Sequence, residues 1–179
     1  MSSRHTEVAS EFRNALRGMA ASVTIITTAD GFGRSGMVAT AVMSVSMEPP
    51  SLVIAVNKSA SIHPRISARG SFCVNILSEW EETIASGFAS AKGEGRFAYG
   101  AWASRTVDAS HYGMPHLVTA EAAIFCKTSA VYDAHGTHSL FVGEVIHVER
   151  SGAFSPLTYC NGRYGTFNDD HVRTAHTVS

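Results

Sequence analysis

The chain has 179 residues, of which 45% are hydrophobic and 16% are charged, and its formal net charge is -1. This composition predicts one globular domain over residues 1–179 and argues against an intrinsically disordered chain. The near balance of 14 basic and 15 acidic residues excludes the strong positive charge of a typical nucleic-acid-binding protein. Charged residues are scarcer than in an average soluble domain, which favours a subunit interface or a large bound cofactor covering part of the surface.

Targeting signals and disulfides are not expected. Residues 1–10 carry charges and no apolar run, so the sequence predicts no secretory signal and a cytoplasmic protein. No apolar run approaches the roughly 18–20 residues that span a bilayer, so no membrane crossing is expected. Cys73, Cys126 and Cys160 are odd in number and widely spaced, which predicts buried free thiols rather than a disulfide framework or a zinc cluster.

The first part of the chain is predicted to be one helix followed by strands. Val8, Phe12 and Leu16 recur at helical spacing, which indicates an amphipathic helix over residues 7–18. Segments rich in Val, Ile and Thr predict strands over residues 22–28, 36–47 and 51–57. Asp30-Gly31 is a hairpin signal between the first two strands, and the double proline at 49–50 ends the second.

Two further helices are expected around a strand over residues 71–77. The first covers residues 61–69 and is ended by Gly70. The second covers residues 80–88 and begins at a capping box formed by Ser78 and Glu81. Residues 89–100 combine Gly and Ser with Lys92, Glu94 and Arg96, which predicts a mobile surface loop.

The second half of the chain is predicted to contain strands only, over residues 102–107, 117–119, 122–132, 139–150 and 157–160. About eight strands with two or three short helices predict a mainly β fold, an antiparallel barrel that is closed or nearly closed, because closure removes exposed edges. A polar tail from about residue 169 is expected to be frayed.

The segment 36–47 is the most informative strand when it is divided by its two-residue period. One face is predicted to be apolar core and contains Met37, Ala39, Ala41, Met43, Val45 and Met47. The other contains Gly36, Val38, Thr40, Val42, Ser44 and Ser46. Small residues beside hydroxyl groups would let a flat polar ring approach the main chain. A solvated strand face explains the same pattern.

Two short segments could complete a binding site. Residues 57–61 follow a strand and lead into a helix, where Lys58 and the serines would favour an anion such as a phosphate. A plain surface loop with Ser61 as the helix cap remains the alternative. Phe88, Ala89 and Ser90 would add an apolar wall and a hydroxyl at the end of a helix.

Other chemistries find little support. The chain has nine histidines, and His135 and His138 stand at H-x-x-H spacing with His111 and His116 upstream, but no set of zinc ligands converges in the sequence. There is no G-x-S-x-G motif for a serine hydrolase. G-x-G-x-x-G is also absent, so any nicotinamide or flavin chemistry would not use a Rossmann fold.

Together, these segments resemble the short-chain flavin reductase family, the FMN-binding split-barrel reductases. The resemblance runs from Phe12 to about Phe167, and includes Phe88-Ala89-Ser90 with Arg96 and Phe97 after it. It is carried further by SVTIITT, SGMVATAVMSVSMEPPSLVIAVNKSASIH, GSFCVNIL, GTHSLFVGEV and PLTYCNGRY. The long central stretch through the double proline is its most specific part. The resemblance implies an antiparallel split β-barrel of the FMN-binding type.

The resemblance also implies roles for individual residues. The isoalloxazine ring would contact Val38, Ala39, Thr40, Ala41, Ser44 and Ser46. The phosphate of the flavin would be held by Asn57, Lys58, Ser59 and Ser61. The wall of the site would be completed by Phe88, Ala89 and Ser90.

The nicotinamide side is implied by a G-D-H turn that the family places beside this ring. It corresponds here to Gly136, Thr137 and His138, so His138 would be the catalytic residue and Thr137 stands where Asp is common. Ile62 likewise stands where the family often has Thr. Arg163 and Tyr164 would line the nicotinamide side.

The function implied by the resemblance is an NAD(P)H:flavin oxidoreductase. It would transfer a hydride from NADH, with NADPH also possible, to FMN or FAD, and the reduced flavin would pass to a partner monooxygenase. Such a reaction needs ring positioning rather than a catalytic acid or nucleophile. A homodimer would account for the scarcity of surface charge.

Two alternatives remain open at the level of the sequence. One is a flavin-binding electron carrier or storage protein of the same barrel without NADH activity. The other is a pyridoxal-phosphate-type oxidase on a related barrel, although the GTH and NKSAS segments fit the reductases better.

Overall fold

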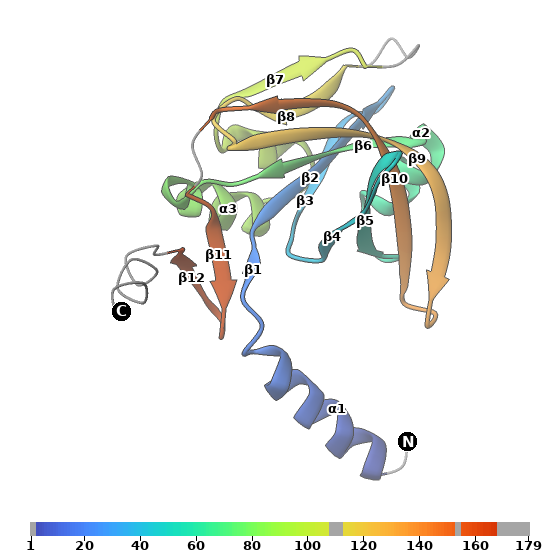
Figure 1. Ribbon diagram of the computed structural model, residues 1–179, viewed down its shortest axis with the longest axis vertical. Coiled ribbons are helices and arrows are strands. Elements are labelled where there is room, and N and C mark those ends of the chain that lie inside the picture. The colour runs from blue at the N-terminus through green and yellow to red at the C-terminus, as the bar shows by residue number, and fades with distance from the viewer. Residues whose placement is uncertain (1–2, 108–112, 153–154, 168–179) are drawn as a thin grey trace, which may run out of the picture.

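Seven antiparallel strands form the main sheet, in the order β3-β2-β6-β9-β10-β5-β4 (Figure 1). The computed structural model describes residues 3–107, 113–152 and 155–167. The strands are β2 (Thr24–Asp30), β3 (Gly33–Ala39), β4 (Val42–Met47), β5 (Pro50–Asn57), β6 (Ser71–Ile76), β9 (Ala122–Ala134) and β10 (His138–Arg150). Val, Ile, Thr and Phe are frequent in them, and these residue types favour extended structure.

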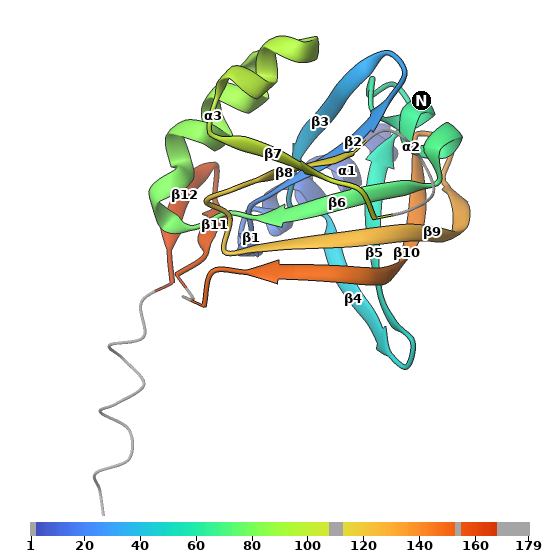
Figure 2. The ribbon, with the colours of Figure 1, turned by 90° about the horizontal axis from the view of Figure 1, so that it is seen from above.

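The two edge strands of this sheet, β3 and β4, follow each other in the chain. Thr40 and Ala41 alone separate them, yet β3 pairs with β2 whereas β4 pairs with β5. The sheet therefore curls until the end of β3 lies beside the start of β4, and the barrel is split between these two strands (Figure 2). The predicted mainly β, antiparallel split-barrel fold is confirmed.

Two smaller sheets accompany the barrel. One contains β1 (Ala21–Ser22), β11 (Leu157–Cys160) and β12 (Arg163–Thr166), and the other contains β7 (Trp102–Arg105) and β8 (Met114–Leu117). β8 is fixed to the barrel because the Thr27 hydroxyl donates to the carbonyl oxygen of Pro115 at 2.5 Å. The Asn75 side-chain oxygen accepts the main-chain N–H of Leu117 at 2.8 Å.

The helices are α1 (Ser3–Leu16), α2 (His63–Arg69) and α3 (Glu82–Ser90), with 3-10 turns η1 (Glu79–Glu81) and η2 (Gly93–Ala98). α2 covers one end of the barrel, where Ile66 joins a buried cluster with Ile26, Ile54, Phe72 and Phe141. Phe88 of α3 belongs to a second cluster with Ile25, Leu77, Phe97 and Leu117. In contrast, α1 projects away from the barrel (Figure 1).

Several local predictions are confirmed. The Asp30-Gly31 hairpin joins β2 to β3, and the Asp30 carboxylate accepts the N–H of Phe32 at 2.8 Å. The capping box is present, with the Glu81 carboxylate accepting the N–H of Ser78 at 2.7 Å, although it opens η1 before α3 begins. The helix predicted over 7–18 is α1, which begins four residues earlier.

The prediction of a single strand over residues 36–47 was wrong. The chain breaks at Thr40 and Ala41, and a register shift between Ser44 and Ser46 interrupts the pairing of β4 again. One alternating pattern therefore does not define one buried face. Three side chains predicted for the core are instead 62%, 53% and 76% exposed on the edge strand β4, namely Met43, Val45 and Met47.

The surface loop predicted over residues 89–100 was also wrong, because most of this segment forms the end of α3 and the turn η2. Phe97 is buried, and the Arg96 guanidinium donates to the carbonyl oxygen of Gly36 at 2.5 Å. The buried Phe97 ring and the hydrogen bond from Arg96 to Gly36 fix the segment, although it is rich in Gly and Ser. Gly36, the acceptor for Arg96, is 60 residues away in the chain, so the composition of the segment did not predict this contact.

Other boundaries moved by a few residues. The strand predicted over 117–119 is β8 at Met114–Leu117, and β12 was missed. α2 begins at His63 with Ile62 in the cap position, so Ser61 is not the helix cap. The tail predicted from residue 169 lies outside the described residues.

The three cysteines are free thiols, and two of them are buried as predicted. Burial raises the pKa of Cys126 to about 12 and that of Cys73 well above its ordinary value. Cys160 is half-buried. The buried pair therefore consists of neutral, unreactive thiols at physiological pH.

Candidate functional site

The break between β3 and β4 exposes main-chain donors. Thr40 and Ala41 are exposed, and within the described residues the amide N–H groups of both lack an acceptor. The break is held on either side, because the Thr24 hydroxyl donates to the carbonyl oxygen of Ala39 at 2.7 Å and Ala55 N–H donates to that of Ala41 at 3.1 Å. Two outward-facing donors thus sit on a fixed piece of backbone.

A cavity of about 210 Å³ lies beside this break, which we call the ring cavity. Val38, Ala39 and Thr40 line it together with Tyr164 of β12, while Val23 and Tyr159 complete it. The structure therefore brings Tyr164 to the predicted ring-binding segment although more than 120 residues separate them in the chain. The rings of Tyr159 and Tyr164 meet edge to face with their centroids 5.4 Å apart.

A second cavity of about 350 Å³ also contains Thr40 in its lining. Its other lining residues include Thr24, Val42, Val74 and Ile124 of the main sheet and residues 20–22, which precede it. Thr40 is therefore the residue shared by the two hollows.

The predicted anion loop, residues 57–61, is folded around Asn57. The side-chain oxygen of Asn57 accepts hydrogen bonds from the N–H and the hydroxyl of Ser59, at 2.9 and 2.8 Å. Lys58, Ser59 and Ser61 are exposed, and within the described part of the chain the N–H groups of Ser61 and Ile62 have no acceptor. The loop thus offers an ammonium group and unused amide donors, the features that bind a phosphate.

The predicted histidine turn lies directly beside the anion loop. Gly136 has φ +77° at the tip of the β9–β10 hairpin, a conformation that favours glycine. Lys58 N–H donates to the carbonyl oxygen of Thr137 at 2.9 Å, and His138 pairs with Asn57 in the sheet. The Thr137 hydroxyl is hydrogen-bonded to Nδ1 of His138 at 2.9 Å. Residues predicted separately for phosphate and nicotinamide therefore form one surface.

A polar chain that the sequence did not indicate supports this surface. Lys58 Nζ lies 3.1 Å from Asp133 Oδ1, and the Ser139 hydroxyl donates to the same oxygen at 3.4 Å. His63 Nε2 is hydrogen-bonded to the buried Ser139 hydroxyl at 2.9 Å. Ser139 and His138 are neighbours on β10, so their side chains lie on opposite faces of the sheet. No local signal in the sequence indicated Asp133 or His63.

The residues predicted for the wall are placed differently. The Phe88 ring is fully buried between Gly36, Phe97 and Trp102, so its face is closed to a ligand. Ala89 and Ser90 are exposed, and the Ser90 hydroxyl donates to the carbonyl oxygen of Gly87 at 3.0 Å.

Ser44, Ser46 and Arg163 lie away from the ring cavity. Ser46 is six residues along β4 from Thr40, roughly 20 Å for an extended strand. Its hydroxyl holds the β4–β5 turn through Glu48. Ser44 is exposed on the same strand. Arg163 is exposed at the start of β12, opposite Cys160.

In residues 3–107, 113–152 and 155–167, no group of three His, Cys, Asp or Glu side chains could hold a metal ion. His111 lies outside these ranges. The helices of the described chain are all too short or too polar to cross a membrane.

Comparisons with known proteins agree with this geometry. The flavin reductase like domain model matches residues 16–168. The chain is 36% identical over 154 residues to the FMN reductase (NADH) RutF of Pseudomonas syringae pv. syringae (strain B728a), with 86% of this chain and 83% of that protein covered. It is 38% identical over 160 residues to the reductase component of FADH(2)-dependent resorcinol hydroxylase from Rhizobium sp. (strain MTP-10005), with coverage of 88% and 86%.

A solved structure extends the likeness to the fold. The NADH:FAD oxidoreductase SgcE6 of Streptomyces globisporus C-1027 superimposes with a TM-score of 0.79 at 29% identity, covering 89% of this chain and 93% of that one. The same protein has also been solved in complex with NAD and FAD fragments. The matched segment includes both edges of the split barrel, the anion loop and the histidine turn. The chain belongs to the flavin reductase like family.

Proposed function

We propose that this chain is a flavin reductase that transfers a hydride from NADH to FMN or FAD. The observation that carries the proposal is the ring cavity, where Val38, Ala39 and Thr40 meet Tyr164 beside two unpaired amide donors. The relatives named FMN reductase (NADH) and NADH:FAD oxidoreductase support both substrates.

The residues present fit a flavin nucleotide. A bound flavin would supply a ring that accepts the hydride at a position stacked against the nicotinamide. Thr40 and Ala41 would donate main-chain hydrogen bonds to the polar edge of that ring. Lys58, Ser59 and Ser61 would hold its phosphate, with the ammonium group, the hydroxyls and the unpaired N–H of Ser61 as donors.

The histidine turn would serve the nicotinamide. His138 is half-buried next to Asn57 of the anion loop, and the Thr137 hydroxyl restrains its ring through Nδ1. A restrained imidazole at this place would orient the nicotinamide and exclude water. Hydride transfer depends on this positioning of the two rings.

The physiological role follows from the same relatives. One of them is the reductase component of a hydroxylase, and we propose that this chain likewise delivers reduced flavin to a partner monooxygenase. Its placement in the cytoplasm stays a prediction from the sequence.

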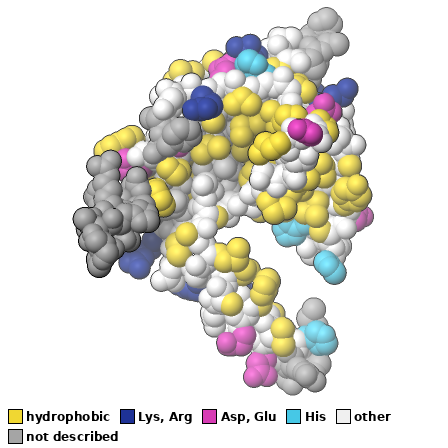
Figure 3. Space-filling view, viewed as in Figure 1, with side chains coloured by type: hydrophobic (Ala, Val, Ile, Leu, Met, Phe, Trp, Pro, Cys, Tyr) yellow, Lys and Arg dark blue, Asp and Glu magenta, His cyan; other side chains and the backbone are white. Residues whose placement is uncertain are grey.

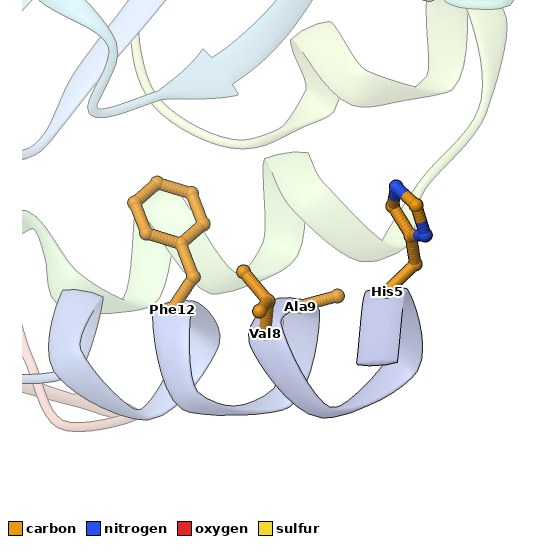
Figure 4. A pocket seen from close by; sticks show the side chains of 4 residues that line it. All are labelled: His5, Val8, Ala9 and Phe12. Carbon is orange, nitrogen blue, oxygen red and sulfur yellow. The ribbon is translucent and has the colours of Figure 1, made fainter. Parts of the chain in front are cut away.

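A homodimer is the second part of the proposal. The apolar side of α1 is exposed and contains Val8, Phe12 and Leu16, and Met19 is exposed just beyond the helix. A hollow of about 520 Å³ lies against this helix and is lined by His5, Val8, Ala9 and Phe12, whose side chains project from one side of α1 (Figure 4). Exposed apolar side chains also gather on the barrel surface above α1 (Figure 3). A second copy that covers these surfaces would bury them.

The dimer is tested by light scattering during gel filtration. Phe12→Glu should shift the mass from that of two chains towards one, while Glu11→Gln on another side of α1 should leave it unchanged. A wild-type mass of one chain at micromolar concentration would contradict the dimer.

The reductase activity is tested by mixing the purified protein with NADH and either FMN or FAD under air. Oxidation of NADH that depends on added flavin is expected, in line with a flavin that is bound and released. A protein that retains tightly bound flavin and is inert towards NADH would instead favour an electron carrier of the same fold.

A further inference from the structure

A pocket of about 250 Å³ lies where the end of α1 meets the β11–β12 hairpin, and we call it the arginine pocket. Its lining includes Arg13 and Leu16 of α1, Arg17 directly after the helix, and Tyr159, Asn161 and Gly162 of the hairpin. Arg13 is in the last turn of α1 and Arg17 follows the end of the helix, and both line the pocket.

Hydrogen bonds between the two elements shape the pocket. Arg17 Nε donates to the side-chain oxygen of Asn161 at 2.9 Å, and Asn161 N–H donates to the carbonyl oxygen of Arg17 at 2.8 Å. These bonds use one N–H of the guanidinium and leave its two terminal amino groups for a ligand. Gly162 has φ +77°, and a Cβ added to it would lie 3.9 Å from Arg17 Nη2, so the absence of a side chain keeps the space beside the guanidinium open.

The charge of the pocket is uncompensated. None of the lining side chains is acidic, and within the described residues neither Arg13 nor Arg17 forms an ion pair. Basic side chains accordingly gather at the junction of α1 with this hairpin (Figure 3), in a chain whose formal net charge is -1.

The arginine pocket adjoins the ring cavity, because Tyr159 lines both. A ligand with an aromatic ring in the ring cavity would therefore carry its next groups past Tyr159 towards Arg13 and Arg17. Guanidinium groups bind phosphate oxygens in a forked geometry that suits two adjacent phosphates. A dinucleotide has such a pyrophosphate, whereas FMN has a single phosphate for which the anion loop already offers donors.

We propose that the arginine pocket binds the pyrophosphate of NADH, whose nicotinamide stacks on the flavin ring in the ring cavity. This inference rests on the proposed reductase function. Arg13 precedes the segment 16–168 that the family model matches, whereas Arg17 lies within it. FAD also has a pyrophosphate, but it contains the phosphate assigned above to the anion loop, and the experiment separates NADH from FAD.

The experiment compares the wild type with Arg13→Ala, Arg13→Lys and the double variant Arg13→Ala/Arg17→Lys. Lys92→Ala, which removes an exposed cation before η2, is the matched control. Arg13 has no partner within the described residues, and Ala favours helix, so Arg13→Ala should fold normally. Circular dichroism and thermal unfolding verify this for each variant.

Two measurements are made on each protein. The first is the dissociation constant for NAD⁺ and for FAD by titration calorimetry, with FMN as the single-phosphate comparison. The second is the KM for NADH, measured with FMN and with FAD as acceptors. Arg13→Ala should weaken binding of the dinucleotide about tenfold, because a charge-assisted contact to phosphate is lost. Arg13→Lys should recover part of this loss, and the loss should shrink as ionic strength rises.

The outcomes separate the possibilities. A raised KM for NADH with both flavins, with weaker NAD⁺ binding, assigns the pocket to the hydride donor. Weaker FAD binding at unchanged NAD⁺ binding would overturn the assignment of the pocket to NADH. Unchanged affinities for both dinucleotides, or an equal loss for FMN, would overturn the inference while leaving an active reductase. A wild type inactive with every pairing would instead overturn the proposed function.

Discussion

The main-chain N–H of Lys58 donates a hydrogen bond to the carbonyl oxygen of Thr137 at 2.9 Å. This bond joins the anion loop to the histidine turn, two segments that lie about 80 residues apart in the chain. Because it uses main-chain atoms, it survives substitution of either side chain. Side-chain variants on the two segments can therefore be interpreted separately.

Asp133 should weaken flavin binding in the wild type by competing for Lys58. Its carboxylate lies 3.1 Å from Lys58 Nζ, and a phosphate must displace it or share the ammonium. Both groups are partly exposed, so solvent screens the pair and its contribution is about 0.2–1 kcal/mol. Asp133→Asn should lower the dissociation constant for FMN roughly two- to fivefold at low salt, as measured by quenching of flavin fluorescence.

The controls for Asp133 follow from its partners. Lys58→Ala should weaken FMN binding, and the double variant with Asp133→Asn should resemble Lys58→Ala alone. Weaker FMN binding by Asp133→Asn would show that the carboxylate positions Lys58 rather than competing for it.

Thr137 should influence the use of NADH without affecting flavin affinity. Its hydroxyl is hydrogen-bonded to Nδ1 of His138 at 2.9 Å, and an ordinary hydrogen bond contributes about 0.5–1.5 kcal/mol. Thr137→Val removes the hydroxyl at constant shape and should lower kcat/KM for NADH about three- to tenfold. Thr137→Ser should retain the wild-type value. An equal loss of flavin affinity in Thr137→Val would refute a role specific to His138.

Gly36 should be intolerant of a side chain. A Cβ at this position would lie 2.6 Å from Phe88 Cζ and 3.0 Å from the carbonyl oxygen of Ile26. Gly36→Ala should therefore lower the free energy of unfolding by about 1–3 kcal/mol in urea denaturation, the usual range for an overpacked core.

Gly95→Ala is the matched control for Gly36, because no atom lies within 4 Å of the added Cβ and its φ is not in the positive range. Its unfolding free energy should match or slightly exceed that of the wild type. The double variant Gly36→Ala/Phe88→Leu should recover part of the loss. A Gly36→Ala protein as stable as the wild type would mean that the Phe88 ring moves freely.

Asp30 should make stability depend on acid pH. The hydrogen bond from the Arg65 guanidinium holds the pKa of the Asp30 carboxyl below its ordinary value. Burial raises this pKa, and the hydrogen bond from Phe32 N–H lowers it further. A depressed pKa in the folded state contributes stability above about pH 4, and this contribution is lost as pH falls through the folded-state pKa. Asp30→Asn should lower the unfolding free energy by about 1–2 kcal/mol at pH 7.

The pH series supplies the test for Asp30. The difference between Asp30→Asn and the wild type should narrow below about pH 4 as the wild-type carboxyl becomes protonated. Glu144→Gln, on an exposed position of β10, should change little at either pH. A difference that stays constant from pH 7 to pH 3 would contradict the role of the ionised carboxylate.

Local signals in the sequence were sufficient for most elements of the fold. The capping box at Ser78, the Asp30-Gly31 turn and the β-branched runs act over a few residues, so each could be predicted without knowledge of the rest. The motifs of the anion loop and the histidine turn were also visible, because their chemistry depends on neighbouring residues.

The position of the site needed the tertiary structure. Alternation over 36–47 suggested one strand, but the chain passes from one edge of the sheet to the other at Thr40, and pairing with two different partners decides this. The burial of Phe88 likewise depends on Gly36 and Trp102, which are distant in the chain.

The sequence by itself determined the near-neutral composition, the strand content and the residue types of a flavin reductase. Composition needs no structure, and the other two depend on short motifs of neighbouring residues. Only the tertiary structure decided that an apolar side of α1 stays uncovered, that Asp133 reaches Lys58, and that Arg13 and Arg17 gather beside the ring cavity. Each of these rests on contacts between segments far apart in the chain, whose geometry no local pattern encodes.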